Sequence, residues 1–202
     1  MHIKDIINKG QPSFSFEFFP PKSDKSSDEL LKTIKDLEPL DPSYVSITYG
    51  AGGTTRERTH ELVEKILDLT NLVPIPHLTC VQHDDEEILR ILNRYCDKGV
   101  SNILALRGDP PKGNNNYDRS HDTFQYACDL VKFIRGFAKK TKSLGIGVAG
   151  FPEGHPETPN RLKEMDYLKA KIDSGADYIC TQLFFDNHDF FDFRERCILA
   201  GI

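Results

Sequence analysis

Short apolar runs alternate with longer segments of helical period along the whole chain. The apolar runs are rich in β-branched and aromatic residues, which favours strands. They lie at 13–19, 44–48, 75–79, 102–106, 147–151 and 178–184. Between them, apolar residues recur at i, i+3 and i+4, the spacing of one helix face. The helices predicted from this spacing lie at about 27–37, 55–69, 84–97, 123–142, 160–174 and 189–199.

This order predicts an α/β fold in which repeated βα units surround a parallel sheet. A (β/α)8 barrel of the TIM type typically takes ~250 residues, and this chain has 202. We therefore expect about six of the eight units, with residues 1–202 forming one barrel domain. An open doubly wound sheet is the alternative, although no GxGxxG follows any predicted strand.

Composition narrows the class of partner. The chain has 26 basic and 31 acidic residues and a net charge of −5, so we expect no nucleic acid partner. No apolar run approaches the ~20 residues that span a bilayer, so we expect no membrane partner either. The five cysteines are odd in number and form no CxxC pair, which favours reduced thiols. We expect a cytoplasmic protein that binds small charged metabolites.

Polar residues recur at the predicted strand ends, where a βα barrel builds its sites. Glu17 interrupts the apolar run FSFEFF. Desolvation by Phe16 and Phe18 would favour the neutral form of this carboxyl group, which can act as a general acid. The alternative is that strand alternation turns Glu17 toward solvent while both phenylalanines pack inward.

Two later strand ends also carry polar groups. Arg107, Gly108 and Asp109 form a turn that offers opposite charges to a ligand, around a glycine that permits close backbone approach. An internal ion pair between Arg107 and Asp109 is the alternative. The amide of Gln182 either reads a planar heterocycle or bonds the neighbouring backbone.

Other polar residues have plain alternative explanations. His77, His155 and His188 show no short ligand spacing such as HxxxH, so the sequence predicts no metal site. His77 is equally typical of a core histidine whose hydrogen bonds are satisfied. Glu164 and Lys171 fit the exposed face of a helix.

Six stretches stand together in a fixed order along the chain. They are SFEFFPPK at 15–22, VSITYGAGG at 45–53, PHLTC at 76–80, ALRGDPP at 105–111, VAGFPEGHPE at 148–157 and GADYICTQLFFD at 175–186. In this order and spacing the chain resembles the catalytic barrel of the methylenetetrahydrofolate reductase family. The six motifs together are far more specific than any one of them.

The resemblance implies a barrel that holds FAD at the strand ends. In that family NAD(P)H reduces FAD and leaves, and methylenetetrahydrofolate then takes the hydride at the same place. The resemblance implies that Glu17 is the general acid that opens the folate's one-carbon ring to an iminium. It also implies that Asp109 is a catalytic carboxylate near flavin and pterin, and that Gln182 contacts folate. The FAD contacts that it implies are Thr48, Tyr49, Ala51, His77, Arg107, Gly108, Asp109, Tyr126, Ala127, Phe151, His155, Glu164 and Lys171.

The chain also departs from the family pattern. Phe151 stands where the bacterial members usually have Tyr, and Glu164 where Asp is common. The family's last two strands have no counterpart in these 202 residues, which leaves two strand edges unpaired. A longer enzyme, closure by association into a homo-oligomer, and rearrangement all stay open.

Two rival functions remain. The first is a non-catalytic protein that binds FAD or folate, or that only associates with a full-length partner. The second is an unrelated lyase or metal-dependent hydrolase barrel. That rival needs a reactive lysine at a strand end or clustered metal ligands, and the sequence indicates neither.

Overall fold

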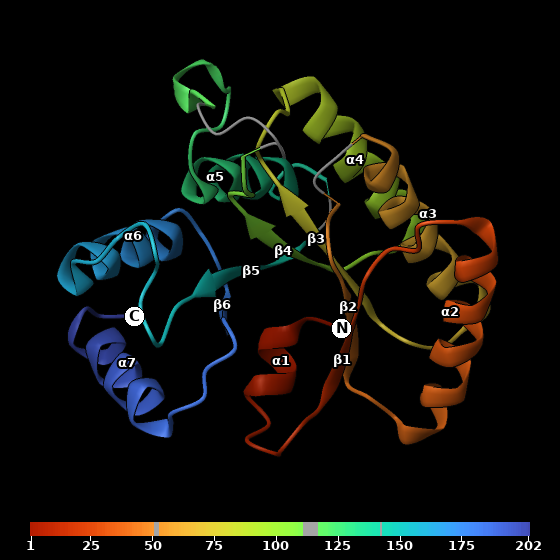
Figure 1. Cartoon of the computed structure of the whole chain (residues 1–202), viewed down its shortest axis with the longest axis horizontal. Helices are drawn as coiled ribbons and strands as arrows, with labels where there is room; N and C mark the ends of the chain where they lie inside the picture. Colours follow the sequence, from red (N-terminus) through yellow and green to blue (C-terminus); the bar gives the residue numbers. More distant parts are fainter. Residues whose placement is uncertain (51–52, 111–116, 142) are drawn as a thin grey trace.

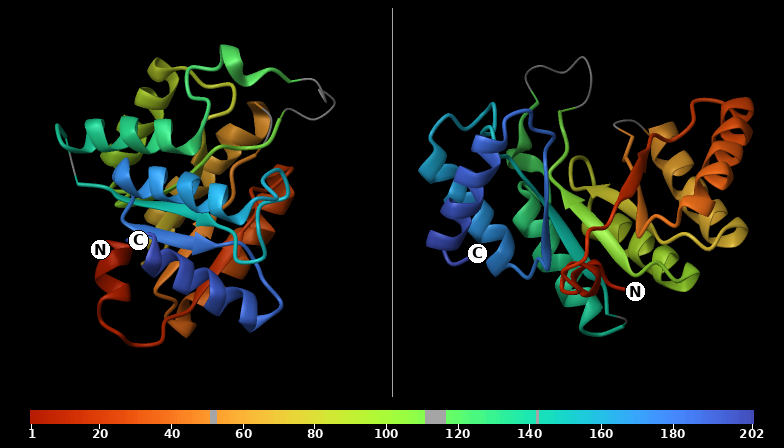
Figure 2. Two further views of the ribbon diagram at one scale, coloured as in Figure 1. Left: turned by 90° about the vertical axis from the view of Figure 1, so that its left-hand side faces the viewer. Right: turned by 90° about the horizontal axis from the view of Figure 1, so that it is seen from below.

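The computed structural model describes residues 1–50, 53–110, 117–141 and 143–202. At its centre lies a six-stranded parallel sheet whose strands pair in sequence order. The strands are β1 (Ser15–Phe18), β2 (Tyr44–Ile47), β3 (Pro74–Thr79), β4 (Asn102–Leu106), β5 (Gly145–Gly150) and β6 (Tyr178–Thr181). The sheet is curved, and β1 and β6 form its two edges within the described chain (Figures 1 and 2).

Helices cover the outer side of this sheet. They are α2 (Asp24–Leu37), α3 (Gly53–Leu69), α4 (Asp85–Lys98), α5 (Ala127–Ala138), α6 (Arg161–Asp173) and α7 (Asn187–Leu199), with 3₁₀ turns η1 (Glu38–Leu40) and η2 (Arg119–His121). Figure 1 shows α2 to α7 as an arc around the sheet, with the short α1 (Ile3–Ile7) inside the arc. Across the described residues, no helix is long and apolar enough to cross a membrane.

The α/β class and the parallel sheet are confirmed. A doubly wound sheet is wrong, because such a sheet reverses its strand order and carries helices on both faces, whereas this one runs from β1 to β6 without reversal. The eight-unit barrel stays a prediction. The helix predicted at 123–142 is shorter, because Asp129 accepts a hydrogen bond from the Tyr126 backbone N–H and the helix begins at Ala127.

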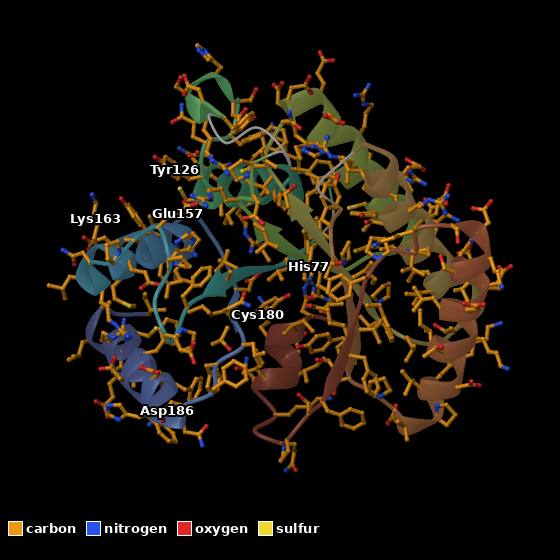
Figure 3. All side chains as sticks on the ribbon, viewed as in Figure 1. His77, Tyr126, Glu157, Lys163, Cys180 and Asp186 are labelled. Carbon is orange, nitrogen blue, oxygen red and sulfur yellow. The ribbon has the colours of Figure 1, made fainter. Side chains whose placement is uncertain are left out.

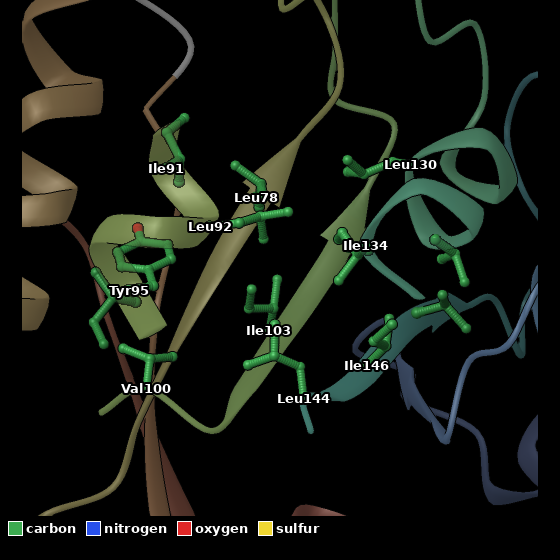
Figure 4. Close-up of a cluster of buried hydrophobic side chains, with 14 of the residues drawn as sticks. Leu78, Ile91, Leu92, Tyr95, Val100, Ile103, Leu130, Ile134, Leu144 and Ile146 are labelled. Atoms are coloured by element: carbon green, nitrogen blue, oxygen red, sulfur yellow. The ribbon is translucent and has the colours of Figure 1, made fainter. Parts of the chain in front are cut away.

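The main core lies between the sheet and the outer helices. Side chains of a strand point alternately to its two faces, and Leu78, Ile103 and Ile146 point outward from β3, β4 and β5. They meet Leu92 of α4 and Ile134 of α5, and all five are fully buried (Figure 4). The apolar stripes read from the sequence therefore face the sheet.

A smaller apolar cluster lies on the inner face of the sheet, under α1. Ile3 and Ile6 of α1 pack with Ile75 and Leu104. The side chain of Asn102 holds this helix in place: its Oδ1 accepts a hydrogen bond from the Ile3 N–H, and its Nδ2 donates to the Met1 carbonyl. The sequence pattern missed α1 because five residues are too few to show a helical period.

Gly145 provides the space that Asn102 occupies, since an added Cβ would overlap Asn102 Oδ1. We predict that Gly145→Ala lowers the free energy of unfolding by about 1–3 kcal/mol through overpacking and loss of the α1 anchor. Gly136→Ala is the matched control, because its Cβ meets nothing within 4 Å in α5. It should stabilise the protein by roughly 0.5–1 kcal/mol. Urea denaturation measures both, and a shift in the same direction for the two variants would contradict this packing.

Candidate functional site

The carboxyl ends of parallel strands meet at one edge of a sheet, and here we call that edge the rim. Most of the polar residues singled out in the sequence lie on it or just below it. Figure 3 shows His77 near the centre of the view, Tyr126 and Glu157 toward α5 and α6, and Cys180 on β6. The groups along the rim come from all six strands and the loops that follow them.

Glu17 lies on the inner face of β1 beside two polar side chains. Ser46 Oγ of β2 donates a hydrogen bond to Glu17 Oε2 at 3.2 Å, and His77 Nε2 of β3 lies 3.5 Å from the same oxygen. Phe16 and Phe18 point to the opposite face and pack against the main core. The Glu17 side chain is 51% exposed, so the expectation that these phenylalanines desolvate it is wrong. Strand alternation is the reason.

His77 is buried, but its hydrogen bonds are not all satisfied. Its Nε2 has no hydrogen-bond partner among the described residues, although Glu17 lies close. Burial lowers the pKa of His77, and the nearby Glu17 carboxylate opposes that change. A neutral imidazole with an open ring nitrogen therefore faces the inner side of the sheet.

The turn after β4 is held against the end of β3. Gly108 has a φ of +84°, and an added Cβ would come within 2.8 Å of Thr79 Cβ. Arg107 Nη1 pairs with Glu157 Oε2 at 2.8 Å, so an internal pair with Asp109 is wrong. Asp109 is instead exposed on the rim. The hydrogen bond from Arg107 holds the pKa of Glu157 below its ordinary value.

Glu164 and Lys171 of α6 turn toward the sheet rather than toward solvent. Both carboxylate oxygens of Glu164 are buried and lack hydrogen-bond partners within the described chain. Lys171 Nζ donates to the Ala149 carbonyl of β5 at 2.6 Å. Burial lowers the pKa of Lys171 to about 8, with Glu164 opposing the shift. The exposed-face interpretation is therefore wrong for both residues.

The loop after β5 passes beside the Glu164 carboxylate. Phe151 and His155 stack edge to face with ring centroids 4.6 Å apart, and His155 Nδ1 accepts a hydrogen bond from the Glu157 N–H. Gly154 has a φ of +96°, and a Cβ there would lie 3.9 Å from Glu164 Oε2. This loop thus brings Glu157 to Arg107 and places the Gly154 backbone beside the Glu164 carboxylate.

Some predicted contacts lie apart from this cluster. The Tyr49 hydroxyl lies 3.0 Å from His83 Nε2, and its ring packs against His60, behind the rim. Thr48 directly follows β2, and its carbonyl accepts a hydrogen bond from Thr59 Oγ1. Tyr126 is exposed ahead of α5, which begins at Ala127.

Gln182 and Ala51 are the two remaining predicted site residues. Gln182 follows β6, with its N–H bonded to the Gly150 carbonyl and its side chain exposed, so it lies outside the strand that was expected to contain it. Ala51 lies outside the described residues.

Sequence reasoning missed Glu157 as a site residue, although it stands inside the motif at 148–157. Its partner Arg107 is far away along the chain, and no local pattern reveals that pair. It also missed Arg119, whose Nη2 donates to the Gly108 carbonyl. No group of three or more metal-ligating side chains occurs among the residues that the structure describes.

The rim offers binding chemistry more than reactive chemistry. Unpartnered carboxylate oxygens at Glu164 accept hydrogen bonds from hydroxyl or N–H groups, and the buried amine of Lys171 attracts an anion. Asp109 and Glu17 add acidic groups toward β4 and β1. None of these side chains transfers a hydride, so an oxidation or reduction here depends on a group that the protein binds.

Comparison with known proteins identifies relatives of the whole chain. A family model described as "Methylenetetrahydrofolate reductase" matches residues 2–202. The chain is 40% identical to the 5,10-methylenetetrahydrofolate reductase of Escherichia coli. The matched region covers 98% of this chain and 66% of that protein. It is 39% identical to the methylenetetrahydrofolate reductase (NADH) 1 of Arabidopsis thaliana, covering 99% and 35%. The chain therefore spans less than two thirds of the length of these relatives.

A solved structure with a similar fold comes from Clostridium thermocellum. It is described as an uncharacterized protein that binds two copies of 5-methyl-5,6,7,8-tetrahydrofolic acid. The TM-score is 0.62 at 15% identity, with 96% of this chain and 62% of the other covered. At that identity, the likeness shows the arrangement of strands and helices and nothing more.

The Glu164 carboxylate should cost the ligand-free protein stability, because it is buried without hydrogen bonds. We predict that Glu164→Met raises the free energy of unfolding by about 1–2 kcal/mol. The control is Glu157→Gln, which weakens a pair whose acid is 59% exposed and should cost no more than about 1 kcal/mol. Chemical denaturation of the ligand-free protein tests both. Destabilisation by Glu164→Met would show that the attraction between this carboxylate and the Lys171 ammonium outweighs that cost.

Proposed function

Because this chain belongs to the methylenetetrahydrofolate reductase family, we propose that it reduces 5,10-methylenetetrahydrofolate to 5-methyltetrahydrofolate with NAD(P)H. The proposal places FAD at the rim, where it would supply the hydride chemistry that links the two substrates. We also propose a cytoplasmic location. The five free thiols support a reducing compartment.

The observation that carries the proposal is the pair of buried polar groups beside β5. Burying a carboxylate without hydrogen bonds is costly, and a protein retains such a group where a ligand satisfies it. Glu164 suits the hydroxyl or N–H donors of a flavin dinucleotide. Lys171 suits its negatively charged phosphate portion, and Arg107 adds a second cation nearby. These residues fit FAD.

The remaining contacts follow the same edge. The residues that would hold FAD, besides Glu164, Lys171 and Arg107, are Thr48, Tyr49, Ala51, His77, Gly108, Asp109, Tyr126, Ala127, Phe151 and His155. Tyr49 would contribute through its backbone, because its hydroxyl is occupied by His83. Bound there, FAD supplies the two-electron chemistry that side chains lack.

Glu17 is the acid of the proposed reaction. It gives a proton to the folate ring nitrogen that leaves as an amine when the one-carbon ring opens. Ser46 and His77 both face Oε2, so Oε1 is the oxygen left to carry the proton. A pterin lying over the inner face of β1 would exclude water from Glu17, and desolvation favours the neutral acid.

Asp109 and Gln182 bind the folate in this proposal. Both are exposed at the rim, Asp109 after β4 and Gln182 after β6. Asp109 accepts hydrogen bonds from pterin N–H groups, and the Gln182 amide both donates and accepts. The folate would thus lie between the strand ends that flank β5, facing Glu17 on the inner side.

The experiment that tests this function is Glu17→Gln with the two half-reactions measured separately. Flavin reduction by NADH should keep its rate, because it needs no acid at Glu17. Oxidation of the reduced protein by methylenetetrahydrofolate should fall by about 10²–10⁴-fold. Glu153→Gln is the control, since the amide still accepts the hydrogen bond from the Phe185 N–H. Equal loss of both half-reactions rejects the acid role, and protein that takes up no flavin rejects the function.

Lys171 predicts how FAD affinity depends on pH. Its pKa of about 8 in the ligand-free protein means that the ammonium form, which attracts phosphate, is lost as pH rises through 8. FAD affinity should therefore weaken above pH 8 by up to about tenfold per pH unit. Lys171→Met should bind more weakly and show no such dependence.

The control for this titration is Lys169→Met, which removes an amine that pairs with Asp173 on the same helix. It should keep the wild-type pH profile. Fluorescence titration with FAD across the alkaline range gives the dissociation constants. A wild-type affinity that stays constant from pH 7 to 10 contradicts the phosphate-binding role of Lys171.

A further inference from the structure

Residues 117–122, ahead of α5, contact the turn that follows β4. Their 3₁₀ turn η2 carries Arg119, whose Nη2 donates a hydrogen bond to the Gly108 carbonyl at 3.0 Å. The guanidinium lies over the Tyr117 ring at 5.7 Å, and the Tyr117 hydroxyl bonds Asp122 Oδ1. Arg119 therefore reaches the turn from a position fixed on its own segment.

The other side of the same turn is held by the two residues that follow β3. The Arg107 carbonyl accepts hydrogen bonds from the Val81 N–H at 3.1 Å and from Cys80 Sγ at 3.3 Å. Gly108 has no space for a side chain on this side. The two carbonyls of the turn are thus held by different elements, Arg107 by the end of β3 and Gly108 by Arg119.

This arrangement sets the direction of two side chains that point the other way. Arg107 leaves the turn toward Glu157 in the loop after β5, and Asp109 leaves it toward the rim. Gly108 joins Arg107 to Asp109, so a change in its backbone angles would alter the direction of one side chain relative to the other. In the described chain, Arg119 is the side chain that bonds the Gly108 carbonyl.

We propose that Arg119 is a positioning residue of the rim: by holding the Gly108 carbonyl, it fixes where Arg107 and Asp109 present their charges to a bound flavin. It touches neither flavin nor folate and acts through the turn. The effect on flavin rests on the function proposed above, whereas the effect on the turn does not.

The test compares Arg119→Met with Arg135→Met. Arg135 makes the same kind of contact at a distant place, donating to the Gly175 and Leu144 carbonyls. Its loss should therefore destabilise the protein without touching the turn. Arg119→Lys is the conservative variant, because an ammonium can still donate to the Gly108 carbonyl. It also keeps the proposal testable if the methionine variant does not fold.

Two measurements are made on each variant. In the flavin-free protein, the Val81 N–H, which donates to the Arg107 carbonyl of the turn, should exchange about tenfold faster in Arg119→Met than in wild type, since one charged hydrogen bond that holds the turn is lost. Its exchange should be unchanged in Arg135→Met. In the loaded protein, Arg119→Met should bind FAD about tenfold more weakly and shift the flavin absorption band, and Arg119→Lys should restore most of both.

Two results would overturn the proposal that Arg119 positions the turn. Unchanged exchange at the Val81 N–H in Arg119→Met overturns the proposal. Faster exchange with an unaltered flavin affinity and spectrum also overturns it, because Arg119 is then structural only. If the wild-type protein takes up no FAD, the proposed function fails, and the exchange rates alone decide whether Arg119 holds the turn.

Discussion

The parallel, in-order pairing of six strands is the constraint on which the rest of the structure depends. It places the carboxyl ends of all six strands on one edge of the sheet. It also places the alternate side chains of each strand on two different faces. The outward set packs under the helices, as Leu78, Ile103 and Ile146 do. The inward set includes Glu17, Ser46 and His77, which approach one another only because their strands are neighbours in register. The candidate site and the main core therefore lie on opposite faces of the same sheet.

The rim carries polar groups whose placement works against the stability of the ligand-free protein. Glu164 is buried without hydrogen bonds, and Lys171 is buried far enough to lower its pKa to about 8. Such costs are common where a site is built to receive a ligand. The backbone around these groups is hydrogen-bonded. Gly108 and Gly154 adopt left-handed conformations; the Gly108 carbonyl accepts from Arg119, and the Gly154 N–H donates to the Phe151 carbonyl. A prepared surface with unsatisfied groups is what a tightly held cofactor requires.

The sequence predicted the repeated units well, because strands such as 102–106 are continuous apolar runs. It failed where tertiary contacts decide. Glu17 stands among phenylalanines in the sequence, yet they lie on the other face of β1. Glu164 and Lys171 look like a solvated helix face until α6 is docked on β5. Arg107 meets Glu157 rather than its neighbour Asp109. Each failure concerns the partner of a polar group, which local periodicity does not contain.

The central claim is that the ends of β3, β4 and β5 with the start of α6 form the flavin site. Hydrogen exchange of the protein with and without saturating FAD tests it most directly. The account predicts that added FAD slows exchange at 107–109, at the non-proline residues of 151–157 and in the first turn of α6, while the α1 end of the sheet is unaffected. Slowing that is absent from these segments, or that centres on α1, would contradict it.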